Sequence, residues 1–177
     1  MDLTYKILLL LNICAITCIS CNCEKNIVSE KYMQINAESP CSENGKSDSK
    51  YFRANASAMS SSISLSREKA IAEAKTLIAK QIIDKAKIAA NRYAEDSQIA
   101  DKQTFLKDIE HAANKTADIL LSEISPTCEK YSETNGKYTT YISTEISRQA
   151  ILNELIKQIA NHTADIEKFI IIFNNYE

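Results

Sequence analysis

The side chains that could perform acid–base or metal chemistry are few and scattered. The sequence has two histidines, His111 and His162, each in a stretch with helical periodicity. Asp108 lies three residues before His111 and could face it, whereas Glu110 is adjacent to His111 and lies on a different side of the helix. The acidic residues show neither the paired spacing of a glycosidase nor a metal-carboxylate helix motif. We therefore expect no catalytic residues, no bound metal and no cofactor, and a protein that is not an enzyme.

Cysteines are the other reactive side chains, and there are six of them. Four lie near the N-terminus: Cys14, Cys18, Cys21 and Cys23. A zinc site is not predicted, because no pair of cysteines at ligand spacing is followed by a second pair or by histidines. Cys41 and Cys128 could form a disulfide in an oxidising compartment or stay as buried thiols, and the sequence does not decide between the two.

The first residues predict export. Residues 7–19 are a mostly apolar run, which is too short for the roughly 20 residues of a membrane-spanning helix but fits the core of a secretory signal. This run ends in Ser20-Cys21, and a small residue directly before a cysteine resembles the lipobox of bacterial lipoproteins, where the cysteine is lipidated. We expect residues 1–20 to be a signal peptide and Cys21 to carry the lipid. Lipidation of Cys23, an ordinary cleaved signal and no targeting role are the alternatives.

Composition restricts the fold and the kinds of partner. Among 177 residues there are only two Gly and two Pro, too few for the turns of a β-sandwich or barrel. Gly45 and Gly136 are far apart, which excludes the clustered glycines of a phosphate-binding loop. The chain carries 21 basic and 23 acidic residues without a basic stripe, so nucleic acid is not an expected partner.

The region after the signal changes from polar to periodic. Residues 21–50 are polar and lack periodicity, which predicts a tether between membrane and domain; a short extension that docks on the domain is the alternative. From Tyr51 the residues alternate as in a half-buried strand. Its predicted buried side chains are Phe52, Ala54, Ala56 and Ala58. Because three of these are Ala, whatever packs on the strand can approach closely.

Two helices should follow. The period predicts a first helix from about Leu65 to Asn91, capped by a serine at about 64 or 66. Its predicted buried face holds Ala70, Ala74, Leu77, Ile78 and Ile82. A polar stretch from Tyr93 to Gln103 leads to a second helix that ends at 122–125, before Pro126. The predicted buried face of the second helix holds Phe105, Ile109, Ala112, Ala113, Thr116 and Leu120.

A hairpin and a last helix complete the pattern. Asn135-Gly136 lies between two strand-like runs, 127–133 and 137–145, as expected for a two-residue type I′ turn. A third helix should begin near Ser147, with a break at 161–163. The apolar run Phe169–Phe173 must be covered by the domain's own core, by another subunit or by a membrane surface.

The order strand, helix, helix, hairpin, helix predicts a single α+β domain over residues 51–177. In this fold a small three-stranded antiparallel sheet packs against long helices.

Several of these segments recur together in a known family. They are the Ser20-Cys21 end of the signal, the strand at 51–54, the helix start at 66–74 and the strand at 137–142 followed by a helix. Together they resemble the LPP-twenty family of small bacterial surface lipoproteins, from the signal to about Leu155. The resemblance implies a fold related to dodecin, where a three-stranded antiparallel sheet cradles a long helix. Dodecins stack flavin on Trp, which this chain lacks, so flavin binding is not implied.

Two functions from different classes are expected to compete. The first is a non-catalytic structural or interaction role in the cell envelope, with a lipid anchor in the outer membrane. Its partner would be a second copy or another envelope protein. The resemblance also implies an assembly role, because domains related to this family occur in a periplasmic flagellar-ring protein. The second is a module in which the sheet and the long helix enclose a small apolar ligand.

Overall fold

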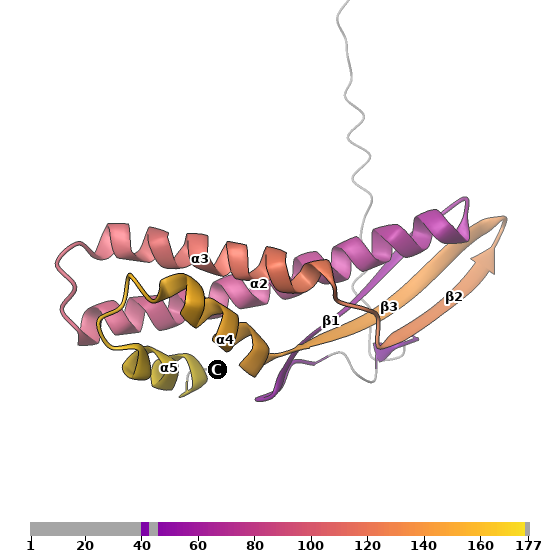
Figure 1. Cartoon of the computed structure of the whole chain (residues 1–177). Helices are drawn as coiled ribbons and strands as arrows, with labels where there is room; N and C mark the ends of the chain where they lie inside the picture. The colour runs from indigo at the N-terminus through magenta and orange to yellow at the C-terminus, as the bar shows by residue number, and fades with distance from the viewer. Residues whose placement is uncertain (1–39, 43–45, 176–177) are drawn as a thin grey trace, which may run out of the picture. The chain divides into compact units, whose positions relative to one another are not determined.

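Three strands and four helices follow one another in the part of the chain that the computed structural model describes, residues 40–42 and 46–175 (Figure 1). They are β1 (Tyr51–Ser60), α2 (Ile63–Asp96), α3 (Lys102–Ser122), β2 (Cys128–Thr134), β3 (Lys137–Ser147), α4 (Arg148–Ile159) and α5 (Ile166–Asn175). The predicted α+β class and element order are confirmed, with the last predicted helix divided into α4 and α5. The predicted signal peptide and Cys21 lie outside the described residues.

The strands form one antiparallel sheet in the order β1-β3-β2. Where β1 pairs with β3, Tyr51 lies opposite Ser147, and where β2 pairs with β3, Cys128 lies opposite Ser143. The hairpin turn has Asn135 at φ 52° and Gly136 at φ 70°, the two positive values that a type I′ turn requires. The predicted hairpin is therefore confirmed.

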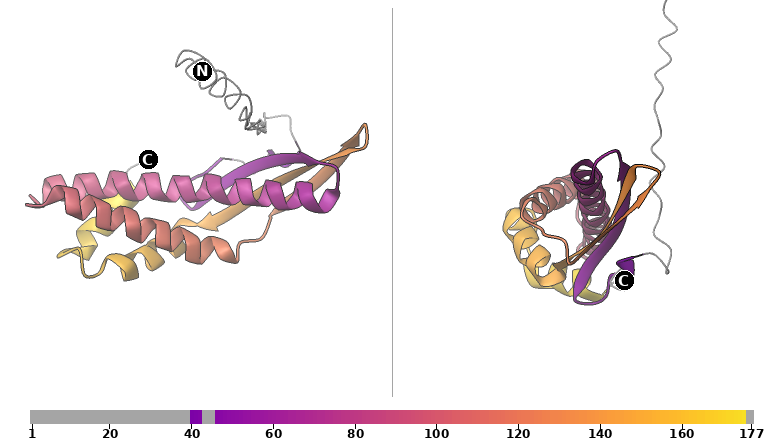
Figure 2. Two further views of the ribbon diagram at one scale, coloured as in Figure 1. Left: turned by 90° about the horizontal axis from the view of Figure 1, so that it is seen from above. Right: turned by 90° about the vertical axis from the view of Figure 1, so that its right-hand side faces the viewer.

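One face of the sheet packs against the first half of α2. Phe52, Ala54, Ala56 and Ala58 are buried on this face, as the alternation predicts. On α2, Ala70 and Ala74 are fully buried opposite them. The helix lies close to the sheet because alanines form both sides of the contact. Figure 2 shows that α2 runs along β1 at its N-terminal end and along α3 towards its C-terminal end.

The start of α2 differs from the prediction. The capping residue is Ser62, whose side chain accepts a hydrogen bond from the Leu65 N–H, rather than a serine at 64 or 66. Ser66 instead is buried and its Oγ lies 2.7 Å from Oγ1 of Thr140 on β3. Leu77, predicted to be buried, is 36% exposed. It lies one turn before Gln81, whose side chain reaches β1, so this stripe of α2 runs along the rim of the contact with the sheet.

The end of α2 contains a core residue, Tyr93, that was expected to lie in a polar stretch. Tyr93 is 1% exposed, and its ring centroid is 5.6 Å from that of Phe105 on α3 and 5.9 Å from that of Phe169 on α5. Its hydroxyl oxygen accepts a hydrogen bond from the Asp165 N–H at 3.1 Å. The prediction of a polar stretch from Tyr93 was wrong because α2 continues to Asp96 and the rings of Phe105 on α3 and Phe169 on α5 bury this side chain.

The remaining helices cover the second half of α2. Helix α3 ends at Ser122, as predicted, and its buried face includes Leu121 in place of the predicted Leu120. Phe169, Ile172 and Phe173 of α5 join the same core, whereas Ile171 is exposed. Of the three predicted covers for the apolar run, the domain's own core accounts for these buried side chains. Among the described residues, none of the helices combines the length and the hydropathy needed to traverse a bilayer.

Candidate functional site

The two histidines and Asp108 do not form a shared site. Nδ1 of His162 lies 3.2 Å from Oδ2 of Asp108, so this carboxylate pairs with His162 and not with His111 as the helical spacing suggested. The turn between α4 and α5 carries His162 to the surface of α3. Within residues 40–42 and 46–175, no three His, Cys, Asp or Glu side chains are grouped to hold a metal ion.

A disulfide joins Cys41 to Cys128 across a sequence separation of 87 residues. Its Cα atoms are 5.6 Å apart, within the usual range for a bridge. Cys41 precedes the first strand, and Cys128 begins β2 at the edge of the sheet. The structure thus selects the disulfide from the two states that the sequence left open, and it fastens the segment before the domain to β2.

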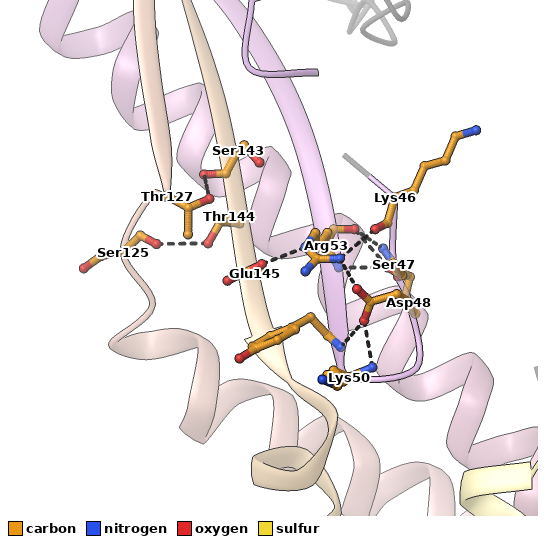
Figure 3. A network of polar contacts seen from close by, with 12 residues as sticks. Lys46, Ser47, Asp48, Lys50, Arg53, Ser125, Thr127, Ser143, Thr144 and Glu145 are labelled. Atoms are coloured by element: carbon orange, nitrogen blue, oxygen red, sulfur yellow. Dashed lines mark hydrogen bonds and ion pairs between the residues drawn. The ribbon is translucent and has the colours of Figure 1, made fainter. Parts of the chain in front are cut away.

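A second contact joins the same segment to β1 (Figure 3). Nη1 of Arg53 lies 2.6 Å from Oδ2 of Asp48, and its Nε lies 2.6 Å from Oε2 of Glu145 on β3. Nη1 also donates to the Lys46 carbonyl oxygen at 3.1 Å. The Arg53 side chain is 19% exposed, which places these charge-assisted bonds partly out of water and makes them stronger than fully exposed ion pairs.

Asp48 holds the turn before β1 with both of its carboxylate oxygens. Oδ1 accepts the N–H groups of Lys50 at 2.7 Å and Tyr51 at 2.8 Å, while Oδ2 faces Arg53. The hydrogen bond from Arg53 and the two backbone N–H groups lower the pKa of Asp48 to about 2. Asp48 and Glu145 in turn raise the pKa of the Arg53 guanidinium. Asp48 is therefore ionised over the ordinary pH range and keeps the turn closed.

The free edge of β1 is satisfied at the same place. The Arg53 N–H donates to Ser47 Oγ at 2.8 Å, and the Arg53 carbonyl accepts from Gln81 Nε2 of α2 at 2.8 Å. Ser47 Oγ also donates to Gln81 Oε1. An unpaired strand edge can pair with another chain, and these bonds cover one residue of it.

We call Cys41, Cys128, Ser47, Asp48 and Arg53 the attachment site. This site attaches the segment before β1 to the strands β1 and β2, and its disulfide can undergo thiol–disulfide exchange.

Near the opposite edge of the sheet, where β2 begins, the loop after α3 is hydrogen-bonded to β3. Thr127 donates its N–H to the Ser143 carbonyl at 2.8 Å, and the Thr144 hydroxyl donates to the Ser125 carbonyl at 3.1 Å (Figure 3). These bonds hold the residue before Cys128 against β3 and so position the cysteine for the disulfide.

The roles of Ser47, Asp48 and Arg53 were not predicted from the sequence. A local signal existed, because Ser and Asp directly before a strand favour turns in which their side chains bind nearby N–H groups. The partners of these residues in space, Gln81 and Glu145, had no such signal. Residues 46–50, part of the predicted tether, therefore make specific bonds with the domain.

No family model matches the chain, and comparison with curated proteins and with solved structures finds no significant similarity.

Proposed function

We propose that the chain is an exported, lipid-anchored protein of the bacterial cell envelope whose role is structural or interactive rather than catalytic. Cys21 is the proposed lipid attachment site, and the outer membrane is the proposed location. The partner is a second copy or another envelope protein.

The observation that carries the proposal is the disulfide between Cys41 and Cys128. Disulfides form and persist in oxidising compartments such as the periplasm and are rare in the cytosol. The signal-like run and Ser20-Cys21 precede this bridge in the same chain. A bridge that needs an oxidising compartment and a leader that would deliver the chain to one support export independently of each other.

The form of the attachment site supports a role at an anchor. The segment between the proposed lipid and the domain is joined to β2 by a covalent bond and to β1 by the Arg53 ion pairs. The alternative role, enclosing an apolar ligand between sheet and helix, is less favoured. Alanines on β1 and α2 and the Ile142 side chain occupy that interface.

Mass spectrometry of the full chain expressed in a Gram-negative host tests the proposal. We expect an N-terminal peptide that begins at Cys21 and carries acyl chains, and a membrane-bound protein. Cys21→Ser should lose the acyl mass and the membrane association. Cys23→Ser is the matched control and should keep both.

An unlipidated chain, or a Cys21→Ser variant that stays on membranes, would refute the anchor. Digestion without reductant should give a peptide in which Cys41 and Cys128 remain joined. Two free thiols in the exported protein would remove the main support for the envelope location.

A further inference from the structure

The face of the sheet turned away from α2 is polar but partly buried. Asn55 lies opposite Ser143, and Ser57 lies opposite Tyr141, on the face opposite to the buried alanines of β1. Ser57 is 5% exposed, Thr139 is 7% exposed and Ser143 is fully buried. A permanently buried face is ordinarily apolar, because a buried polar group without a hydrogen bond is unfavourable. This face has the composition of a surface that water reaches.

Residues 40–42, which we call the strap, lie over this face. Cys41 is bonded to Cys128, and Cys128 is the cross-strand neighbour of Ser143. Sγ of Cys41 is 3.8 Å from the carbonyl oxygen of Tyr141. Cys41 itself is 7% exposed. The disulfide therefore holds the strap against β3 beside the buried Ser143.

Two features make this closed position unfavourable. Oγ of Ser143 and Oδ1 of Asn55 are buried without a hydrogen-bond partner. Cys41 has a φ of 68°, the left-handed region that residues with a Cβ rarely adopt. Strained conformations of this kind persist where the surrounding structure holds them, and here the covalent bond to Cys128 does so.

We propose that the strap is a redox-controlled cover, which the disulfide holds closed and which a dithiol reductant opens. One thiolate of the reductant attacks Sγ of Cys128, the half-buried member of the pair, and the Cys41 thiolate leaves and is protonated. The second thiolate of the reductant then attacks its own sulfur in the mixed disulfide and releases Cys128 as a thiol. Two electrons and two protons pass from the dithiol, which ends as a disulfide, to the two cysteines.

The opening does not extend to residues 46–50. Ser47 and Asp48 are bonded to Arg53 and Gln81 independently of the disulfide, so residues 46–50 remain in place when residues 40–42 leave. Water then reaches Ser143 and Asn55. Opening of the strap requires reduction of the disulfide by a dithiol and does not depend on lipidation of Cys21.

Thiol labelling of the full chain tests the cover. The protein is reduced with dithiothreitol, desalted without oxygen and pulsed with a neutral maleimide, and labelling of Cys41 is quantified by peptide mass spectrometry in native buffer and in urea. We expect Cys41 to react in native buffer within about tenfold of its rate in urea, while the far-UV circular dichroism stays native. Protection of Cys41 by about a hundredfold or more, or loss of the native spectrum on reduction, would overturn the proposal.

A variant pair examines the reason for opening. Ser143→Ala removes the unpaired buried hydroxyl and favours the closed position, so Cys41 in the reduced chain should react at least about fivefold more slowly. Ser132→Ala, at an exposed position on the same face, should change the rate less than about twofold. Equal rates for the two variants would show that the buried hydroxyl does not drive opening.

Discussion

Replacing Tyr93 tests the core where three helices meet. The ring of Tyr93 is almost completely buried between Phe105 and Phe169. Removing a buried aromatic ring costs about 3 to 5 kcal/mol, so Tyr93→Ala should lower the free energy of unfolding by about that amount. A domain of ordinary stability has about 5 to 15 kcal/mol in total, so this variant should be close to unfolding.

A second variant separates the ring from its hydroxyl. Tyr93→Phe keeps the packing and removes the acceptor of the Asp165 N–H, which should cost about 0.5 to 1.5 kcal/mol. The assay is urea denaturation of the oxidised chain followed by far-UV circular dichroism. Tyr131→Ala is the matched control, because Tyr131 is 66% exposed and its loss should change stability by less than about 0.5 kcal/mol. If Tyr93→Ala destabilised the chain no more than this control, the described core would be incorrect.

Three further predictions address the sheet and the attachment site. Ala74→Leu should overpack the contact between α2 and the sheet and cost about 1 to 3 kcal/mol in urea denaturation, whereas Ala72→Leu at an exposed position should be nearly neutral. Gly136→Ala should cost about 1 kcal/mol by the same measurement through backbone strain alone, since an added Cβ would meet no atom within 4 Å; an unchanged midpoint would contradict the left-handed turn. Because the folded-state pKa of Asp48 is lowered to about 2, its stabilisation is complete above the unfolded value near 4 and is lost as the pH falls towards 2; Asp48→Asn should flatten this part of the curve of urea midpoint against pH, and a curve that keeps the wild-type slope would contradict the role of Asp48.

The elements that the sequence predicted are those whose signals are local. The alternation of β1, the Asn135-Gly136 turn and the end of α3 at Ser122 each depend on neighbouring residues. Backbone geometry then forces the strand pairing, because a two-residue turn fixes the register of β2 against β3.

The features that the sequence did not predict depend on residues that are distant in the chain. Tyr93 lies in the last turn of α2, beyond the predicted end of this helix at Asn91, and its ring is buried against Phe105 and Phe169. Helical spacing offered Asp108 a neighbour in His111, but the turn after α4 provides His162 instead. Local spacing limits which contacts are available, and the tertiary fold selects among them.

The disulfide also determines how the domain would respond to mechanical load. A pull on the segment before Cys41 passes through the sulfur bridge into the first residue of β2 and spreads to β3 through the Cys128–Ser143 pairing. β1, α2 and α3 lie within the covalent loop between the two cysteines and are bypassed by this force. With the bridge reduced, the same pull would enter through Asp48 and Arg53 and act on β1, at the other edge of the sheet. A chain held at its N-terminus would thus resist extension with a covalent bond in one redox state and with ion pairs and hydrogen bonds in the other.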